Sequence, residues 1–274
     1  RYELSGHNCM ARAIVRGRHD FELTRVVVDG QARIVGRPVG HDAEPTLQLE
    51  GDRLEGVDAQ QPYGAFSITG NPAWFAGHGL ALRGANIHLH RGKNLLWIDA
   101  PGEMTLRLDR DFEGRPLAEP GQLQVVWQSR MVFDGRSARF EESVVATHYR
   151  RAVGPASPAR LVARAAAGEP MEPFAQLRTD TLEVQLEQAV RFDRSTAPAE
   201  PRPELILCRG GVSVESRSLA DPAPAAGAAS GGAVLGVGAM PGGGAATPAS
   251  VDRMEVADLS INLLSGAMTA GGPG

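Results

Sequence analysis

The sequence predicts an all-β protein with antiparallel strands, and three observations lead to this fold class. Apolar residues mostly alternate with polar ones, as in Leu182, Val184 and Leu186. This period of two is typical of strands that turn one face to a core. Glycine-containing dipeptides separate many of the alternating runs. Finally, residues 257–274 repeat the pattern of residues 85–102 without a gap.

The alternating runs are short, and each is expected to form one or two strands. The first run is interrupted by Asp29-Gly30, a dipeptide that is favoured in two-residue hairpin loops. We therefore expect a tight hairpin at that point. The runs that alternate in this way are residues 24–36, 45–56, 64–77, 80–90, 123–135, 138–149, 177–192, 204–216 and 252–264.

Two segments break the alternation. Residues 150–176 contain Ser157 and Pro158, which suit the first turn of a helix, and Gly168, which suits its end. We expect either one short helix or an irregular insertion there. Residues 218–249 consist mostly of alanine, glycine, proline and serine. Such a segment buries too little apolar surface to offset the entropy of ordering, so a flexible, disordered Gly/Ala/Pro-rich loop is predicted.

The similarity between residues 85–102 and 257–274 is part of a longer internal repeat. Asp52-Arg53-Leu54-Glu55 is matched by Asp180-Thr181-Leu182-Glu183, and a strand, a glycine and a second strand follow in both halves. Short strands of this kind bury a face by stacking on copies of themselves. A sandwich, a half-open barrel or a curved roll would fit, and a parallel β-helix is the rival. The predicted units are residues 1–118 and 119–274.

Composition limits the classes of function. Hydrophobic residues make up 42% of the 274 residues and aromatic residues only 5%, which predicts an aliphatic core with Trp74, Trp97 and Trp127 at its corners. The net charge is −4 and there is no basic block, so no nucleic-acid partner is expected. Cys9 and Cys208 make no disulfide framework. No apolar run approaches the roughly 20 residues that span a bilayer.

Candidates for catalysis are few. Asp109, Asp111 and Glu113 cluster beside two arginines, but they are interpreted as a solvated strand end. His88 and His90 would lie on one strand face, which is half of a metal site without a third ligand. The common hydrolase, metalloprotease and nucleotide-binding motifs do not occur in the sequence. We therefore expect no catalytic residues, no metal and no cofactor.

Several motifs resemble the OstA-like proteins of the Gram-negative envelope. The segments are MVFDGRSARFEESVVATHY (131–149), LRTDTLEVQL (177–186), CRGGVSVES (208–216) and the strand that ends in Gly272-Pro273-Gly274. They are similar to the strand and turn patterns of this lipopolysaccharide-transport family, which includes organic solvent tolerance protein-like domains. Glu142 stands where the family usually has a glycine before its second strand.

The resemblance implies both a fold and an activity. The fold would be an antiparallel β-taco, or open β-jelly-roll, built from two OstA-like halves. Its groove would shield the acyl chains of lipopolysaccharide or another glycolipid, and its edge strands would pair with neighbouring β-domains. The implied location is the periplasm or cell envelope of a Gram-negative-type bacterium. Because Pro101-Gly102 continues into another apolar run, its match at Pro273-Gly274 leads us to expect that the chain is part of a longer protein.

Three hypotheses for function remain open at this stage. The first is a lipid-handling envelope domain without catalysis. The second is a structural or assembly scaffold with the same fold and a closed core, and the third is a glycan-active β-helix enzyme. The candidates for the lipid groove are Val26, Val28, Ile34, Phe66, Ile68, Ile87, Leu89, Leu182, Val184, Leu186, Ile206, Val212, Val214, Leu259 and Ile261.

Overall fold

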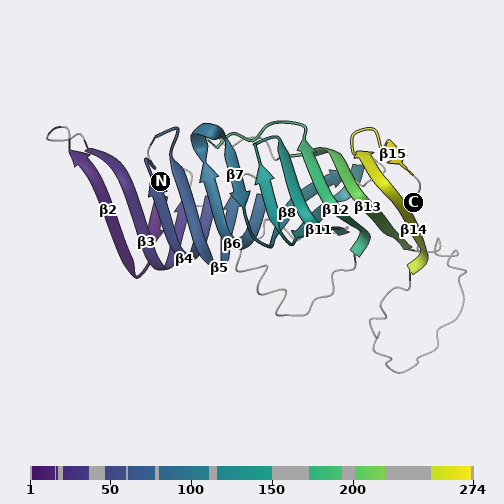
Figure 1. Cartoon of the computed structure of the whole chain (residues 1–274), viewed down its shortest axis with the longest axis horizontal. Coiled ribbons are helices and arrows are strands. Elements are labelled where there is room, and N and C mark those ends of the chain that lie inside the picture. Colours follow the sequence, from purple (N-terminus) through teal and green to yellow (C-terminus); the bar gives the residue numbers. More distant parts are fainter. Residues whose placement is uncertain are drawn as a thin grey trace, which may run out of the picture.

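The computed structural model describes residues 2–15, 17, 21–36, 47–59, 61–77, 80–110, 116–149, 173–192, 201–219 and 248–272. This part of the chain is all-β, and the strands follow one another along the long axis from β2 to β15 (Figure 1). The only helical element of the described residues is the 3-10 turn η1 (Arg91–Lys93). The strands are β1 (Tyr2–Ser5), β2 (Asn8–Val15), β3 (Phe21–Gly36), β4 (Leu47–Val57), β5 (Ala65–Gly77), β6 (Leu80–His90), β7 (Leu95–Ile98), β8 (Gly102–Arg110), β9 (Pro116–Trp127), β10 (Arg130–Phe133), β11 (Ser137–Tyr149), β12 (Pro173–Leu186), β13 (Pro203–Leu219), β14 (Pro248–Asn262) and β15 (Met268–Gly271).

The hairpin expected at Asp29-Gly30 is wrong. Strand β3 continues through this dipeptide, and both of its halves pair with β4, with a register shift between Asp29 and Ala32. Gly30 and Gln31 have φ angles of 75° and 52°, which bend the strand instead of reversing it. A dipeptide that tolerates positive φ serves a bend as well as a hairpin loop, so the sequence signal was correct and its interpretation was not.

Similar bends recur in the other long strands. Gly210 and Gly211 bend β13 with φ angles of 84° and 70°. Glu142 and Ser143 bend β11 with φ angles of 71° and 49°, although a side chain makes this conformation costly. Register shifts mark the corresponding points of β4, β5, β12 and β14. Each of these strands therefore has two halves that run in different directions.

The bends divide the strands into two half-sheets. The β7 half-sheet contains β2, β7, β10, β15 and the halves of the long strands that continue them. The β8 half-sheet contains β1, β8, β9 and the other halves. Strand β6 pairs with β8 through Leu80–Gly84 and with β7 through His88–His90. Strand β11 divides in the same way between β10 and β9.

The divided strands close a central barrel. The pairings run β6, β7, β10, β11, β9, β8 and back to β6, which makes a six-stranded antiparallel barrel with further strands on either side. All strand pairs of the described residues are antiparallel, so the parallel β-helix is excluded for them.

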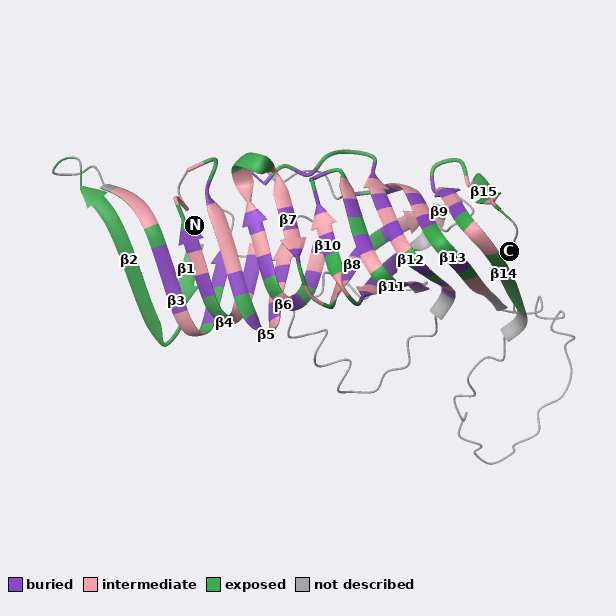
Figure 2. Ribbon diagram, in the orientation of Figure 1, coloured by how far each residue is buried: buried purple, intermediate pink, exposed green. Residues whose placement is uncertain are grey.

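The core fills the interior, which is the space between the two half-sheets. Buried and half-buried residues alternate along the central strands (Figure 2). The core is mostly aliphatic, as expected from composition, with Trp127 of β9 fully buried against Phe140 of β11 at a ring distance of 5.2 Å. The Trp127 indole N–H donates to the carbonyl oxygen of Ala100 over 2.8 Å, so its polar atom is satisfied.

The internal repeat appears as two hairpins with the same register. Leu89 pairs with Leu96 between β6 and β7, and Ile261 pairs with Met268 between β14 and β15. Both pairs are related by the same offset that relates residues 85–102 to 257–274. The expected division at residues 118 and 119 falls inside β9, where one continuous sheet crosses it.

The two interrupting segments are shorter than expected. Residues 173–176 belong to β12, and the predicted helix or insertion at 150–172 lies outside the described residues. Residues 218–219 end β13 and residues 248–249 begin β14, which corrects the predicted limits of the Gly/Ala/Pro-rich loop. Its remainder, residues 220–247, lies outside the described residues. No helix in the described part of the chain has the length and apolarity to cross a membrane.

Candidate functional site

The apolar interior contains all the residues predicted for a groove. They come from both halves of the chain, and all are buried except Phe66 and Val214, which are partly buried and pack against the core. Alternation identified them because each strand presents every second side chain to the interior. Whether they contact a lipid is a separate question that burial alone does not answer.

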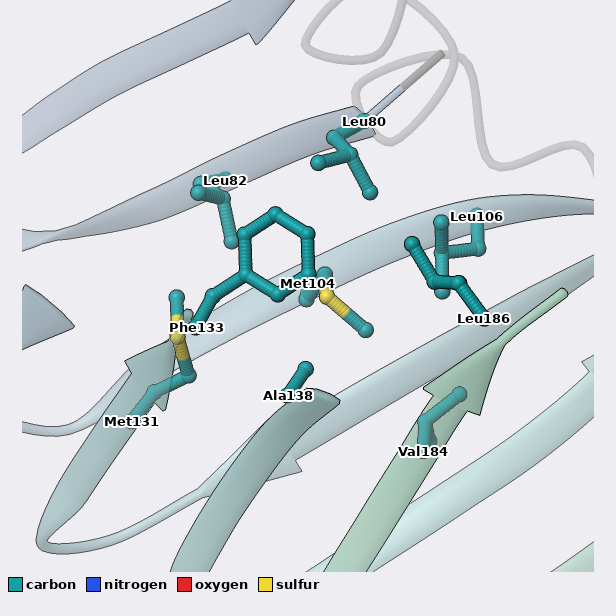
Figure 3. Close-up of a pocket in the computed structure, with 9 residues that line it drawn as sticks. All are labelled: Leu80, Leu82, Met104, Leu106, Met131, Phe133, Ala138, Val184 and Leu186. Carbon is teal, nitrogen blue, oxygen red and sulfur yellow. The ribbon is translucent and has the colours of Figure 1, made fainter. Parts of the chain in front are cut away.

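Nine residues line the centre of the interior, and only two of them, Val184 and Leu186, were among the predicted candidates. Leu80 and Leu82 of β6 and Met104 and Leu106 of β8 face Phe133 and its neighbours across a small cavity (Figure 3). The sequence signal for them was the same alternation, in LALRG and MTLRL. The residues that line the cavity are Leu80, Leu82, Met104, Leu106, Met131, Phe133, Ala138, Val184 and Leu186.

This central cavity has a volume of about 10 Å³. Such a space is about the size of a single water probe. The half-sheets are therefore closely packed in the centre, and an acyl chain fits there only if the half-sheets or a covering segment move. The interior as it stands resembles a filled core more than an open channel.

A short irregular segment covers the rim of the interior, and sequence reasoning did not identify it. Residues Glu187–Phe192 follow β12 without forming a strand, yet Val190 and Phe192 are buried in the core. The Phe192 ring lies 6.5 Å from the ring of Phe75 and 5.9 Å from that of Phe133, centroid to centroid, with edge-to-face geometry in both pairs. Only two of its positions are buried, so the segment has no periodic pattern to detect.

The two ends of the structure differ from its centre because their outer strands are exposed. Every residue of β2 is exposed, including Met10 at 66% and Ile14 at 49% (Figure 2). At the other end Met268 of β15 is 46% exposed, whereas its repeat equivalent Leu96 is fully buried. In the described part of the chain, no strand pairs with the outer edge of β2 or β15. Unpaired edges of this kind can accept a further strand.

The two histidine candidates and Asp109 make contacts with other residues of the fold. His88 stacks on Trp97 with ring centroids 5.0 Å apart, and His90 Nδ1 accepts a hydrogen bond from the Lys93 backbone N–H at η1. Asp109 lies 3.3 Å from Arg202 Nε. Asp111 and Glu113 lie outside the described residues. Within the described ranges, no group of three or more histidine, cysteine, aspartate or glutamate residues could hold a metal ion.

The three tryptophans differ from one another in burial, and so do the two cysteines. Of the tryptophans, only Trp127 lies in the core, while Trp97 and Trp74 are half-buried on the outer faces of the half-sheets. Both cysteines are free: Cys9 is exposed on β2, and Cys208 is buried on β13. Burial raises the pKa of the Cys208 thiol to about 12. It is therefore protonated near neutral pH and is not a nucleophile there.

The described residues thus offer an apolar interior, a covered rim and two exposed ends. Comparison with protein-family models, with curated proteins and with solved structures finds no match to the chain.

Proposed function

We propose that the protein is a non-catalytic domain of the bacterial cell envelope that joins β-domains end to end and shelters the acyl chains of a glycolipid. The motif resemblance to OstA-like proteins supports a β-taco architecture and a periplasmic location. One observation carries the bridging role. At the centre of the molecule β7 pairs with β10, and this pairing is called the central junction below. The exposed ends of the chain match the two sides of this junction.

The C-terminal end has the form of one side of that junction. Strand β15 lies beside β14 in the same register in which β7 lies beside β6. At the centre, β7 then pairs with β10 through Leu96 and Phe133. The equivalent position beside β15 has no strand in the described residues, and Met268 is exposed there. A β10-like strand placed at this edge would cover Met268 as β10 covers Leu96.

The N-terminal end has the form of the other side. Strand β3 pairs with β2 through its first half and with β1 through its second half. Strand β11 pairs in the same way with β10 and β9, which precede it in the same chain order. Strand β2 is therefore the β10-like strand that the edge of β15 lacks. A second copy of this chain, or a β-domain of the same kind, supplies the complementary edge.

Sedimentation velocity over a range of concentrations tests the bridging role. Met268→Glu should weaken end-to-end association at least about ten-fold, which corresponds to about 1.4 kcal/mol, because a carboxylate would be buried beside the added strand. Met268→Leu, which copies Leu96, should preserve association. Val57→Glu is the matched control, since Val57 is 43% exposed but lies on β4, which is paired on both sides.

A protein that stays monomeric at all concentrations, alone and with candidate β-domain partners, would contradict the bridging role. Equal weakening by Met268→Glu and Val57→Glu would also contradict it, because the effect would then be one of surface charge in general.

The lipid-handling role is supported by the apolar interior, which runs through both halves of the chain. Each methylene group transferred from water into such a site stabilises binding by about 0.8 kcal/mol. Native mass spectrometry of the whole chain with added lipopolysaccharide tests this role. A complex with glycolipid is expected, and an unchanged protein mass at saturating lipid would contradict it.

A further inference from the structure

The segment Glu187–Phe192 is called the strap below. It lies on the rim, which is the end of the half-sheets opposite the bends in the strands. It begins where β12 ends, and β12 runs from its bend near Thr179 toward this rim. Asn94, which precedes β7, and Gly135, which follows β10, are on the same rim. The strap therefore runs back from β12 across the ends of β10 and β7.

The strap has a buried side and an exposed side. Val190 is 1% exposed and Phe192 is 6% exposed, whereas Glu187, Gln188 and Arg191 are exposed to solvent. Phe192 inserts between Phe75 of the β8 half-sheet and Phe133 of the β7 half-sheet. One aromatic side chain thus fills the opening between the half-sheets at this point of the rim.

The strap forms no strand and is attached by hydrogen bonds to backbone and side-chain groups of other segments. At its start the Glu187 N–H donates to the Arg202 carbonyl oxygen over 2.8 Å. Asn94 Oδ1 accepts from the Phe192 N–H over 2.9 Å, and Asn94 Nδ2 donates to the Val190 carbonyl oxygen over 2.9 Å. The Val190 N–H donates to the Gly135 carbonyl oxygen over 2.7 Å. Arg91 Nε donates to the Phe192 carbonyl oxygen over 3.0 Å. Attachments of this kind can release without breaking the pairing of any strand.

The strap and the central cavity have two neighbouring residues in common. Phe133 lines that cavity and contacts Phe192, and Leu186 lines it and immediately precedes the strap. All the other lining residues are aliphatic or methionine, and they converge from both half-sheets (Figure 3). Displacement of Phe192 would uncover Phe75 and Phe133, and Phe133 is one wall of this cavity. An aliphatic chain placed there would meet apolar side chains.

We propose that the strap is a displaceable gate, and that an aliphatic chain enters the interior by taking the place of Phe192 between Phe75 and Phe133. This inference rests on the lipid-handling part of the proposed function. In the closed state Phe192 fills the place that the aliphatic chain would take. A ligand therefore binds only the fraction of molecules in which the strap is released. Its apparent affinity falls by that fraction.

Hydrogen exchange on the wild-type chain, with and without palmitic acid as the probe, tests the gate directly. The Val190 and Phe192 amides, which donate to Gly135 and Asn94, should exchange at least about ten-fold faster when palmitate is bound. A photoreactive palmitate analogue should crosslink to Phe75, Phe133 or Leu186. This measurement needs no variant and therefore does not depend on how well a variant folds.

Variants then test whether release of the strap limits binding. Asn94→Gly and Phe192→Ala should bind palmitate at least about ten-fold more tightly than the wild type, because the closed state is weakened in both. Asn262→Ala is the matched control, since the Asn262 side chain also holds a turn by accepting two backbone N–H groups, those of Leu264 and Ser265. It should bind palmitate like the wild type.

The possible outcomes separate the gate from the proposed function. Palmitate binding to the wild type with unchanged strap exchange and equal affinity in all variants would overturn the gate and leave the lipid role in place. Faster strap exchange in Asn94→Gly without palmitate binding to any variant would overturn both the gate and the lipid role. Binding to the variants with crosslinks at Phe75 or Phe133 would support the gate. The bridging role depends on neither result, since sedimentation tests it.

Discussion

Replacing Asn94 by glycine should destabilise the folded protein by about 3 kcal/mol, an unusually large effect for one half-buried polar residue. The Asn94 side chain makes three hydrogen bonds to backbone groups of other segments. It donates to the carbonyl oxygens of Asp134 over 3.1 Å and Val190 over 2.9 Å, and it accepts from the Phe192 N–H over 2.9 Å. One side chain thus joins the β7 rim, the turn after β10 and the strap.

The magnitude follows from these bonds and from the backbone. Each hydrogen bond contributes about 1 kcal/mol, and loss of the side chain leaves two partly buried backbone groups to find other partners. Asn94 also has left-handed backbone angles, φ 51° and ψ 41°, which glycine adopts freely. Asn94→Ala should therefore cost about 1 kcal/mol more than Asn94→Gly, because alanine is strained in that conformation.

Urea unfolding followed by tryptophan fluorescence measures these differences, with Asn262→Ala as the control. The control should lose less, since the two hydrogen bonds of Asn262 are exposed. Asn94→Asp keeps the shape and the acceptor of the side chain but cannot donate to the two carbonyl oxygens, so it should also be destabilised. The reasoning is refuted if Asn94→Gly and Asn94→Asp both lie within about 0.5 kcal/mol of the wild type.

Four further predictions concern the backbone and the two thiols. Glu142→Gly should raise the free energy of unfolding by about 1 kcal/mol, because Glu142 has a φ of 71°, and an unchanged urea midpoint would contradict this. Gly135→Ala should destabilise the fold markedly in the same assay, since its φ is 93° and its new Cβ would overlap the Asn94 side chain; a stable variant would show that this turn can shift. Burial raises the pKa of the Cys208 thiol from its ordinary value of 9.0 to about 12. The stability that the protonated thiol contributes is therefore fully present below about pH 9 and is lost as the pH rises toward 12. Cys208→Ala should flatten this alkaline decline in melting temperature, and an equal decline in both proteins would contradict the reasoning. In the same folded protein a thiol reagent at pH 8 should modify Cys9 alone.

Much of the fold could be predicted from sequence because strands bury alternate residues. The groove candidates all proved to lie on the interior face, and the repeat at residues 85–102 and 257–274 proved to be two hairpins of one register. In contrast, Asp29-Gly30 was misinterpreted, because positive φ at a glycine serves a strand bend and a hairpin loop equally well. Only the partners on both sides of β3 distinguish the two.

The β class, the aliphatic interior and the repeated unit could all be predicted without a structure, since they follow from local alternation and composition. Which of the two repeat copies is covered by a further strand depends on contacts that form only in the folded protein. Leu96 and Met268 occupy equivalent positions in the repeat, yet one is fully buried and the other is 46% exposed. The reason is that β10 pairs with the outer edge of β7, whereas no described strand pairs with the outer edge of β15. Phe192 likewise became part of the interior only through Phe75 and Phe133, which are distant in the chain. Such contacts leave no local period, so folding alone brings them together.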